Sequence, residues 1–237
     1  MTGCSPPGPG ARGPEGAHGL RADAARNRAA ILAVASDVFA EQGLEAPLEV
    51  IAARAGVGIA TLYRRFPTRE KLVGAALVDK VAQYAQAAEQ ALEIPDPWAG
   101  FAGFVRRICE LQAGDRGLGD LLSMTLAADE QIEQLRRTAN DDVITLIERA
   151  KASGTLRDDF VGEDLLLLLI ATAAVMQVTR GDAPDAWRRF VALALDAFSS
   201  HDSPALPEPP TTVQMTRAMA RLVAERGCGS RVGDQGT

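Results

Sequence analysis

The chain has little of the material from which catalytic and metal sites are built. Its 237 residues contain two histidines, His18 and His201, which lie near the two ends. The three cysteines, Cys4, Cys109 and Cys228, are far apart, and none has CxxC spacing. A zinc site or a histidine-based catalytic pair therefore has almost no raw material. An odd number of scattered cysteines does not favour a disulfide framework, so we expect a cytoplasmic protein that binds no metal and no cofactor.

Long apolar runs and strand-like alternation are also scarce. The most apolar stretch, residues 165–179, is shorter than the roughly 18 residues that a membrane-spanning helix needs. Residues 1–20 are rich in Gly and Pro and lack the apolar region of a signal peptide, so we expect a disordered tail. Because no convincing two-residue alternation is present, the sequence predicts an all-α fold.

Helical spacing of apolar residues begins near residue 23 and is divided by glycine and proline. We expect Gly43 to end the first helix in the left-handed conformation, Pro47 to open the second, and Gly56 to form the turn before the third. Pro67 should stop the third helix and Thr68 should cap the fourth. The expected helices cover approximately residues 23–42, 47–55, 59–66, 69–93, 97–114, 117–127, 129–153, 163–180 and 184–200.

These helices predict two folded units and two tails. Residues 21–68 form an N-terminal three-helix unit, and residues 69–201 form a larger helical domain. Residues 202–237 begin with a Pro-rich segment and are expected to be mostly disordered, although residues 211–227 have moderate helical periodicity.

The distribution of charge singles out the N-terminal unit. The formal net charge of −6 argues against indiscriminate binding to nucleic acid or membranes, yet residues 20–72 carry eight Lys or Arg against six Asp or Glu. Arg64 and Arg65 end the third helix, and Arg69 and Lys71 open the fourth. Cations at a helix N-terminus oppose the macrodipole by up to about 1 kcal/mol. This placement is unfavourable for stability but suits the binding of a phosphate.

The second and third helices, with the glycine turn between them, fit a helix-turn-helix. Leu62 and Phe66 would form the apolar back of its second helix, which must enter the major groove. Arg64 is placed for a bidentate guanine contact worth about 1–3 kcal/mol, whereas Tyr63 and Arg65 suit phosphate contacts. Arginine pairs also occur on solvated helices, and the basic start of the fourth helix favours the DNA-binding interpretation. The residues predicted to contact DNA are Ile59, Ala60, Thr61, Tyr63, Arg64, Arg65, Arg69 and Lys71.

Approximately residues 24–75 resemble the DNA-binding domain of the TetR/AcrR family of transcriptional regulators. The residues that fall on the family pattern are Phe39, Gly43, Ile51, Ala52, Ala55, Gly56, Val57, Thr61, Leu62, Tyr63, Phe66, Glu70 and Leu72. The resemblance implies an all-helical homodimer whose paired recognition helices enter successive major grooves of a palindromic operator. It also implies a small ligand that binds in the larger domain and releases the DNA.

The chain departs from the family pattern at the edges of the motif. Arg69 stands where the basic residue is usually Lys, and Ala60 where Gly is frequent. Pro47 and Leu48 replace the Ser or Thr that caps the second helix and touches phosphate in many members.

The larger domain contributes two further predictions. Residues 165–176 form a helix that is apolar nearly all round, and the helix over residues 184–200 is also apolar, so we expect a homodimer through the last two helices. An ordinary monomer core is the alternative. An apolar ligand pocket is predicted from residues that also fit a plain core, namely Trp98, Phe101, Phe104, Ile108, Leu122, Met124 and Met176.

The sequence thus favours a ligand-released, dimeric repressor that acts at a palindromic operator. In a second hypothesis the C-terminal domain responds to a protein partner rather than to a small ligand. An enzyme is a third, but the chain has no catalytic His, metal cluster, Gly-rich phosphate loop or nucleophile motif.

Overall fold

The computed structural model describes residues 15–115, 130–199, 204–218 and 221, and all long elements among them are helices. The β-type pairing in this part of the chain is one isolated bridge between Leu156 and Ser199. The all-α prediction is therefore confirmed. The helices are α1 (Glu15–Gln42), α2 (Leu48–Arg54), α3 (Ile59–Arg65), α4 (Arg69–Leu92), α5 (Pro97–Gly114), α7 (Glu130–Ala152), α8 (Gly162–Thr179) and α9 (Ala186–Phe198). The helix expected over residues 117–127 lies outside the described residues.

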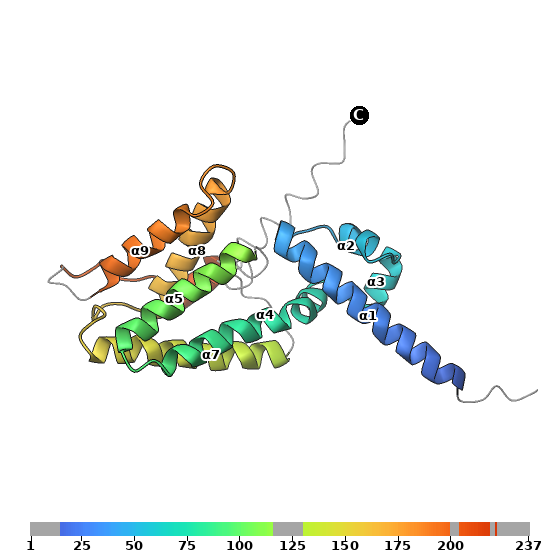
Figure 1. The fold of residues 1–237 in the computed structure, drawn as a ribbon, viewed down its shortest axis with the longest axis horizontal. Helices are drawn as coiled ribbons and strands as arrows, with labels where there is room; N and C mark the ends of the chain where they lie inside the picture. The colour runs from blue at the N-terminus through green and yellow to red at the C-terminus, as the bar shows by residue number, and fades with distance from the viewer. Residues whose placement is uncertain (1–14, 116–129, 200–203, 219–220, 222–237) are drawn as a thin grey trace, which may run out of the picture.

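The helices form two units that α4 connects (Figure 1). In the first unit, α1, α2 and α3 enclose a core around Phe39, Ile51 and Leu62, and the first turns of α4 add Leu72 and Leu77 to it. The N-terminal core therefore extends past the boundary expected at residue 68. The second half of α4 runs along α7 into the larger domain.

The larger domain has its own core, formed by α4, α5, α7, α8 and α9. Phe101, Phe104 and Phe160 are fully buried in it, and Phe160 packs edge-on against both Phe101 and Phe198. Arg149 of α7 donates hydrogen bonds to the carbonyl oxygens of Leu92 and Ile94, at 2.6 and 3.0 Å, and so fixes the end of α4.

Gly43, Gly56 and Thr68 act as the sequence predicts, and Pro47 differs by one position. Gly43, Gly56 and Gly154 have φ angles of 84°, 66° and 71°, in the left-handed region that favours glycine. The Thr68 hydroxyl accepts a hydrogen bond from the backbone N–H of Lys71 at the start of α4. Pro47 is the N-cap of α2 rather than its first helical residue.

The first helix begins earlier than predicted. Expected to start near residue 23, α1 starts at Glu15, so residues 15–20 are helical and do not belong to a disordered tail. The helix extends over this segment although Gly16 and Gly19 are poor helix formers. Residues 1–14 lie outside the described part of the chain.

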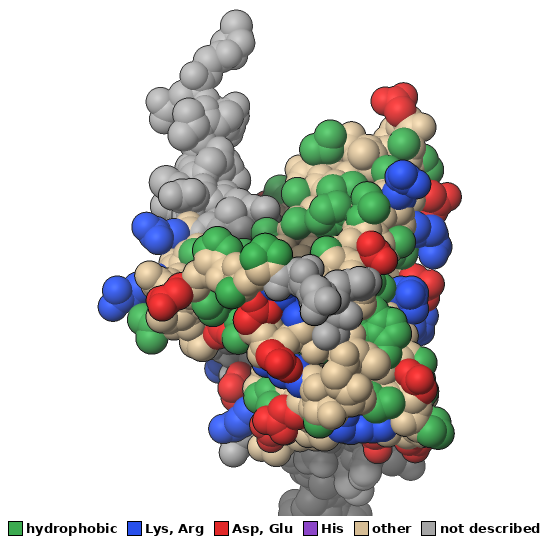
Figure 2. All heavy atoms as spheres, turned by 90° about the vertical axis from the view of Figure 1, so that its left-hand side faces the viewer, with side chains coloured by type: hydrophobic (Ala, Val, Ile, Leu, Met, Phe, Trp, Pro, Cys, Tyr) green, Lys and Arg blue, Asp and Glu red, His purple; other side chains and the backbone are tan. Residues whose placement is uncertain are grey.

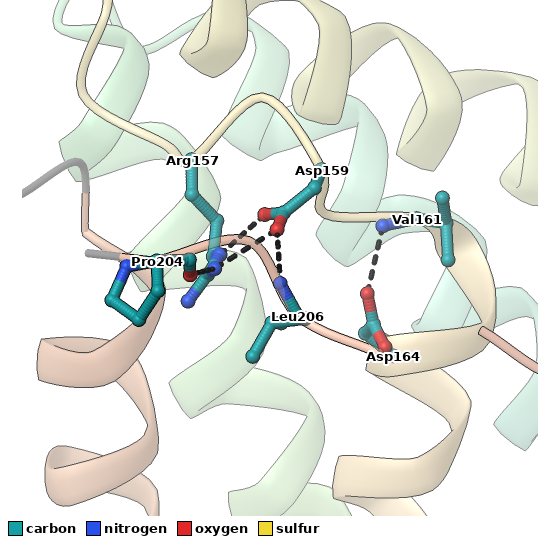
Figure 3. Close-up of polar contacts among 6 residues, drawn as sticks. All are labelled: Arg157, Asp159, Val161, Asp164, Pro204 and Leu206. Atoms are coloured by element: carbon teal, nitrogen blue, oxygen red, sulfur yellow. Dashed lines mark hydrogen bonds and ion pairs between the residues drawn. The ribbon is translucent and has the colours of Figure 1, made fainter. Parts of the chain in front are cut away.

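The segment after α9 is not a loose tail over the residues that the structure describes. Arg157 binds both Asp159 and the carbonyl oxygen of Pro204, and the Asp159 carboxylate accepts a hydrogen bond of 2.9 Å from the Leu206 backbone N–H (Figure 3). The Thr212 hydroxyl bonds to Glu163 at the start of α8, and Met215 is buried. The disorder predicted for residues 202–237 is therefore wrong for the segment 204–215, which proline stiffens and specific polar contacts hold in place.

Candidate DNA-binding site and regulatory domain

The helix-turn-helix is built from backbone geometry rather than from capping side chains. Gly56 at φ 66° lets the chain reverse after α2, and the Val57 N–H then bonds to the carbonyl oxygen of Ala52 at 3.0 Å. Leu62 and Phe66 are buried against the N-terminal core, as predicted. This anchoring fixes the direction in which the rest of α3 faces.

The predicted DNA-contact residues of α3 lie on its outer side. Tyr63 is 46% exposed and Ile59 36% exposed, although both are large and one is apolar. Ala60, Arg64 and Arg65 are exposed as well, whereas Thr61 is half-buried. An exposed set of this kind, opposite an anchored apolar face, is what a helix that enters a groove requires.

Arg69 and Lys71 do not share one environment at the start of α4. Lys71 is exposed, but Arg69 is half-buried and its Nη1 donates to the carbonyl oxygens of Leu44 and Ala46, at 2.7 and 2.9 Å. The Arg69 guanidinium group thus holds the connection between α1 and α2 through Nη1, and a phosphate contact by Arg69 or Lys71 stays a prediction. The carboxyl pKa of Glu70 is lowered, because backbone N–H groups and the Thr68 hydroxyl stabilise its charged form.

A groove of about 1010 Å³ lies between α1, the end of α3 and α4. Arg28, Arg65 and Lys71, one residue from each helix, line the end of this groove beside Phe66. The guanidinium group of Arg28 stacks over the Phe66 ring. Further along α1 and α4 the lining becomes apolar and mixed in charge. Three cations thus line one groove beside α3, together with the carboxylate of Glu70.

Most of the predicted ligand-contact residues are core residues. Phe101, Phe104 and Ile108 are at most 2% exposed and pack within the larger core, and Trp98 and Met176 pack against it while partly exposed. The two others, Leu122 and Met124, lie outside the described residues. Their spacing along α5 also fits an ordinary core-facing helix, so their contact with a ligand stays a prediction.

Two buried polar side chains that the sequence analysis missed lie in this core. Gln112 of α5 and Thr172 of α8 are 4% and 0% exposed, and neither makes a hydrogen bond to a described nitrogen or oxygen atom. The Thr172 hydroxyl lies beside the thiol of Cys109. Cys109 is on α5, one turn before Gln112 and on the same face of the helix. Burial raises the pKa of Cys109 to about 11, so the thiol is protonated at neutral pH and unsuited to redox sensing. In the sequence, each of these buried polar side chains could have been found as a single polar residue on the apolar face of a predicted helix.

Exposed apolar side chains lie on the outer side of α8 and α9, where α9 also exposes Arg189 and Asp196 beside Leu193. Leu167, Val178 and Leu193 are 42%, 84% and 58% exposed, and Figure 2 shows hydrophobic side chains gathered in the upper part of the face at the level of these helices. The helix α8 is long and apolar enough to cross a membrane by length and composition alone, a test that core helices of soluble proteins also pass. In the single chain, α8 is therefore buried on one side and leaves apolar side chains exposed on the other. Among the described residues, no group of three or more His, Cys, Asp or Glu side chains could hold a metal ion.

Comparisons with protein families match both units. Residues 31–76 match the model described as bacterial regulatory proteins, tetR family. Residues 96–198 match the model of the C-terminal domain of SbtR-like transcriptional regulators. A comparison with curated proteins finds no match.

Solved structures give the same family. The chain is 34% identical to the TetR transcriptional regulator SCO0520 from Streptomyces coelicolor, with 73% of this chain and 98% of that chain covered and a TM-score of 0.47. It is also 34% identical to a TetR regulatory protein from Mycobacterium vanbaalenii, with coverage of 76% and 99% and a TM-score of 0.40. The regulator FadR from Bacillus subtilis, solved with stearoyl-CoA, is 19% identical, with coverage of 71% and 98% and a TM-score of 0.52.

Proposed function

Since the chain belongs to the TetR family and is a DNA-binding transcriptional regulator, we propose that it is a ligand-released, homodimeric repressor that acts at a palindromic operator in the cytoplasm. The observation that carries the proposal is the exposed outer side of α3 opposite its buried anchors, Leu62 and Phe66. Regulators of this family are generally not enzymes, and nothing in the chain indicates catalysis.

Each exposed side chain of α3 is assigned a role by its chemistry. Arg64 reads a guanine, and the small side chains of Ala60 and Thr61 allow close approach to the base edges. Ile59 meets a thymine methyl group. Tyr63 contacts a phosphate, which fixes the register without reading the sequence.

The phosphate contacts extend beyond α3. Arg65 and Lys71 line the same end of the groove as Arg28, so the three cations can follow one stretch of DNA backbone beside the major groove that α3 enters. Each neutralised phosphate makes binding more dependent on salt. The cationic end of this groove explains how an acidic protein can bind DNA locally.

Dimerisation through α8 and α9 is supported by the pattern of exposure. Leu167, Ala171, Ala174 and Val178 follow i, i+4, i+7, i+11 spacing and lie on one face of α8. Leu167, Ala174 and Val178 are exposed, and Leu193 adds an exposed apolar side chain on the neighbouring α9. A second copy of the same face would cover this surface, and a dimer presents the two recognition helices that a palindrome requires.

The ligand is supported by Gln112 and Thr172, whose buried polar atoms make no hydrogen bond to a described nitrogen or oxygen atom. The Gln112 amide offers a donor and an acceptor, and Thr172 offers a hydroxyl, but the buried residues that the structure describes include no charged side chain. A charged group would therefore be costly to bury there. We accordingly propose an apolar ligand with an uncharged polar group, bonded by Gln112 and Thr172.

Genomic footprinting of the purified protein, followed by binding assays on the site found, tests the proposal. Arg64→Ala should reduce the preference for the operator over single-base variants by about 1–3 kcal/mol at the guanine position. Arg65→Ala, its matched neighbour, should weaken binding to all sequences alike. The proposal is lost if the wild-type protein prefers no palindrome over random DNA at moderate salt.

A further inference from the structure

The first residue of α4 is a cation, although the N-terminus of a helix disfavours positive charge. A cation there lowers the stability of the helix, and Glu70 offsets only part of this effect. An arginine at this position must therefore make contacts that stabilise the protein by more than its charge destabilises the helix. Its neighbour Lys71, two residues later, faces solvent and supplies a matched comparison.

The Arg69 guanidinium group gains its partners from the chain that follows α1. Its Nη1 donates to Leu44 O at 2.7 Å and to Ala46 O at 2.9 Å. The Nη1 nitrogen carries two hydrogens, so each carbonyl oxygen can accept one of them. Leu44 and Ala46 are 2% and 3% exposed, so these charge-assisted bonds form where water competes little.

The segment that Arg69 holds determines where the helix-turn-helix begins. Residues 43–47 are the whole connection between α1 and α2, and α2 has no side-chain N-cap. Pro47 has no backbone N–H, so it cannot donate a hydrogen bond to another residue of this connection. The bonds of Arg69 therefore tie the start of α2, and through it α3, to the first residue of α4.

We infer that Arg69 is a positioning residue for DNA recognition, which sets α2 and α3 relative to α4, rather than a phosphate contact. The inference rests on the proposed function only because DNA binding is one of the two measurements that test it. A planar guanidinium group presents several donors in a fixed geometry, whereas the ammonium group of lysine is a point charge. Arg69→Lys therefore keeps the charge but loses the geometry.

Salt dependence separates a positioning residue from a phosphate contact. We compare Arg69→Met, Arg69→Lys and Lys71→Met by fluorescence anisotropy on the footprinted operator and a scrambled duplex. Lys71→Met should lower the slope of log K against log salt concentration by about one per protomer and leave the operator preference unchanged. Arg69→Met should leave that slope unchanged and reduce operator affinity and preference by about tenfold or more, with Arg69→Lys between it and the wild type. An Arg69→Met slope as low as that of Lys71→Met, or no effect at all, would overturn the inference.

Hydrogen exchange of the free protein gives a readout that needs no DNA. Loss of the Arg69 bonds should speed amide exchange in the first turn of α2 in Arg69→Lys, and in Arg69→Met if that variant folds, but not in Lys71→Met. Unchanged exchange in Arg69→Lys would contradict the positioning role. If the wild-type protein shows no operator preference while exchange changes as expected, the proposed function fails and the role of Arg69 stands.

Discussion

The guanidinium carbon of Arg28 lies 5.3 Å from the centre of the Phe66 ring, so a side chain of α1 is held against the residue that follows α3. Arg28 is exposed, and Phe66 is 3% exposed. Stacking on an aromatic face orients an arginine without neutralising its charge. Arg28 therefore keeps its charge in the groove that Arg65 and Lys71 also line.

We expect Arg28→Gln to weaken binding to all DNA sequences and to lower the slope of log K against log salt concentration by about one per protomer, because one phosphate contact is lost. Arg54→Gln is the control. Arg54 is equally a surface arginine, but it lies on α2 and pairs with Glu41 at 2.8 Å, outside the groove. Equal slopes for the two variants, measured by anisotropy between low and moderate salt, would show that Arg28 makes no such contact.

The apolar face of α8 and α9 should determine the oligomeric state. Leu193→Glu and Leu167→Glu place charges where a second copy is proposed to pack, so we expect the dimer to dissociate to monomers at micromolar concentration. The measurement is size-exclusion chromatography with light scattering. Val213→Glu, at an apolar side chain that is 59% exposed and outside these helices, should leave the mass unchanged. A monomeric wild-type protein would contradict the prediction at the outset.

Local signals in the sequence predict most of the fold. Gly43, Gly56 and Thr68 mark helix ends through backbone conformation or capping, which depend on a few neighbouring residues. The outer side of α3 was predictable for the same reason, because Leu62 and Phe66 fix its rotation within one short helix.

Contacts between distant parts of the chain could not be predicted in this way. Arg69 meets Leu44 and Ala46 only after two helices have folded between them. Likewise, the contact of Leu206 with Asp159 requires α8 and α9 to return the chain to that corner. Helical periodicity gives the face that a residue occupies but does not say which face of another helix it meets.

The buried polar pair should be a liability to stability in the ligand-free protein. Gln112→Met and Thr172→Val remove buried polar atoms that bond to no described nitrogen or oxygen, each of which costs about 1–3 kcal/mol to bury, so we expect the thermal midpoint to stay the same or rise. Thr155→Val is the matched control, because the Thr155 hydroxyl donates to the carbonyl oxygen of Ala150 at 3.1 Å and its loss should lower the midpoint. If Thr172→Val lowers the midpoint as far as Thr155→Val does, the hydroxyl has a structural partner and the ligand assignment is wrong.

Cys109 should be chemically silent while the protein is folded. Its burial raises the thiol pKa to about 11, so the thiol form is the stable one below the ordinary cysteine pKa of about 8.5. The free energy of unfolding should therefore fall as pH rises from about 8.5 toward 11, since the unfolded chain releases this proton first. In a Cys4→Ser, Cys228→Ser variant, iodoacetamide at neutral pH should label Cys109 only at the rate of unfolding. Rapid labelling of the folded variant would show that the thiol is accessible.

The segment after α9 determines where an attached group would emerge from the molecule. The bond from Thr212 to Glu163 and the burial of Met215 return the chain to the first turn of α8. A fluorophore or fusion partner joined just after residue 215 would therefore lie at that end of α8, about 27 Å along the helix from the turn that leads into α9. A fragment cut at residue 201 would lose this anchorage and uncover the Arg157–Asp159 corner.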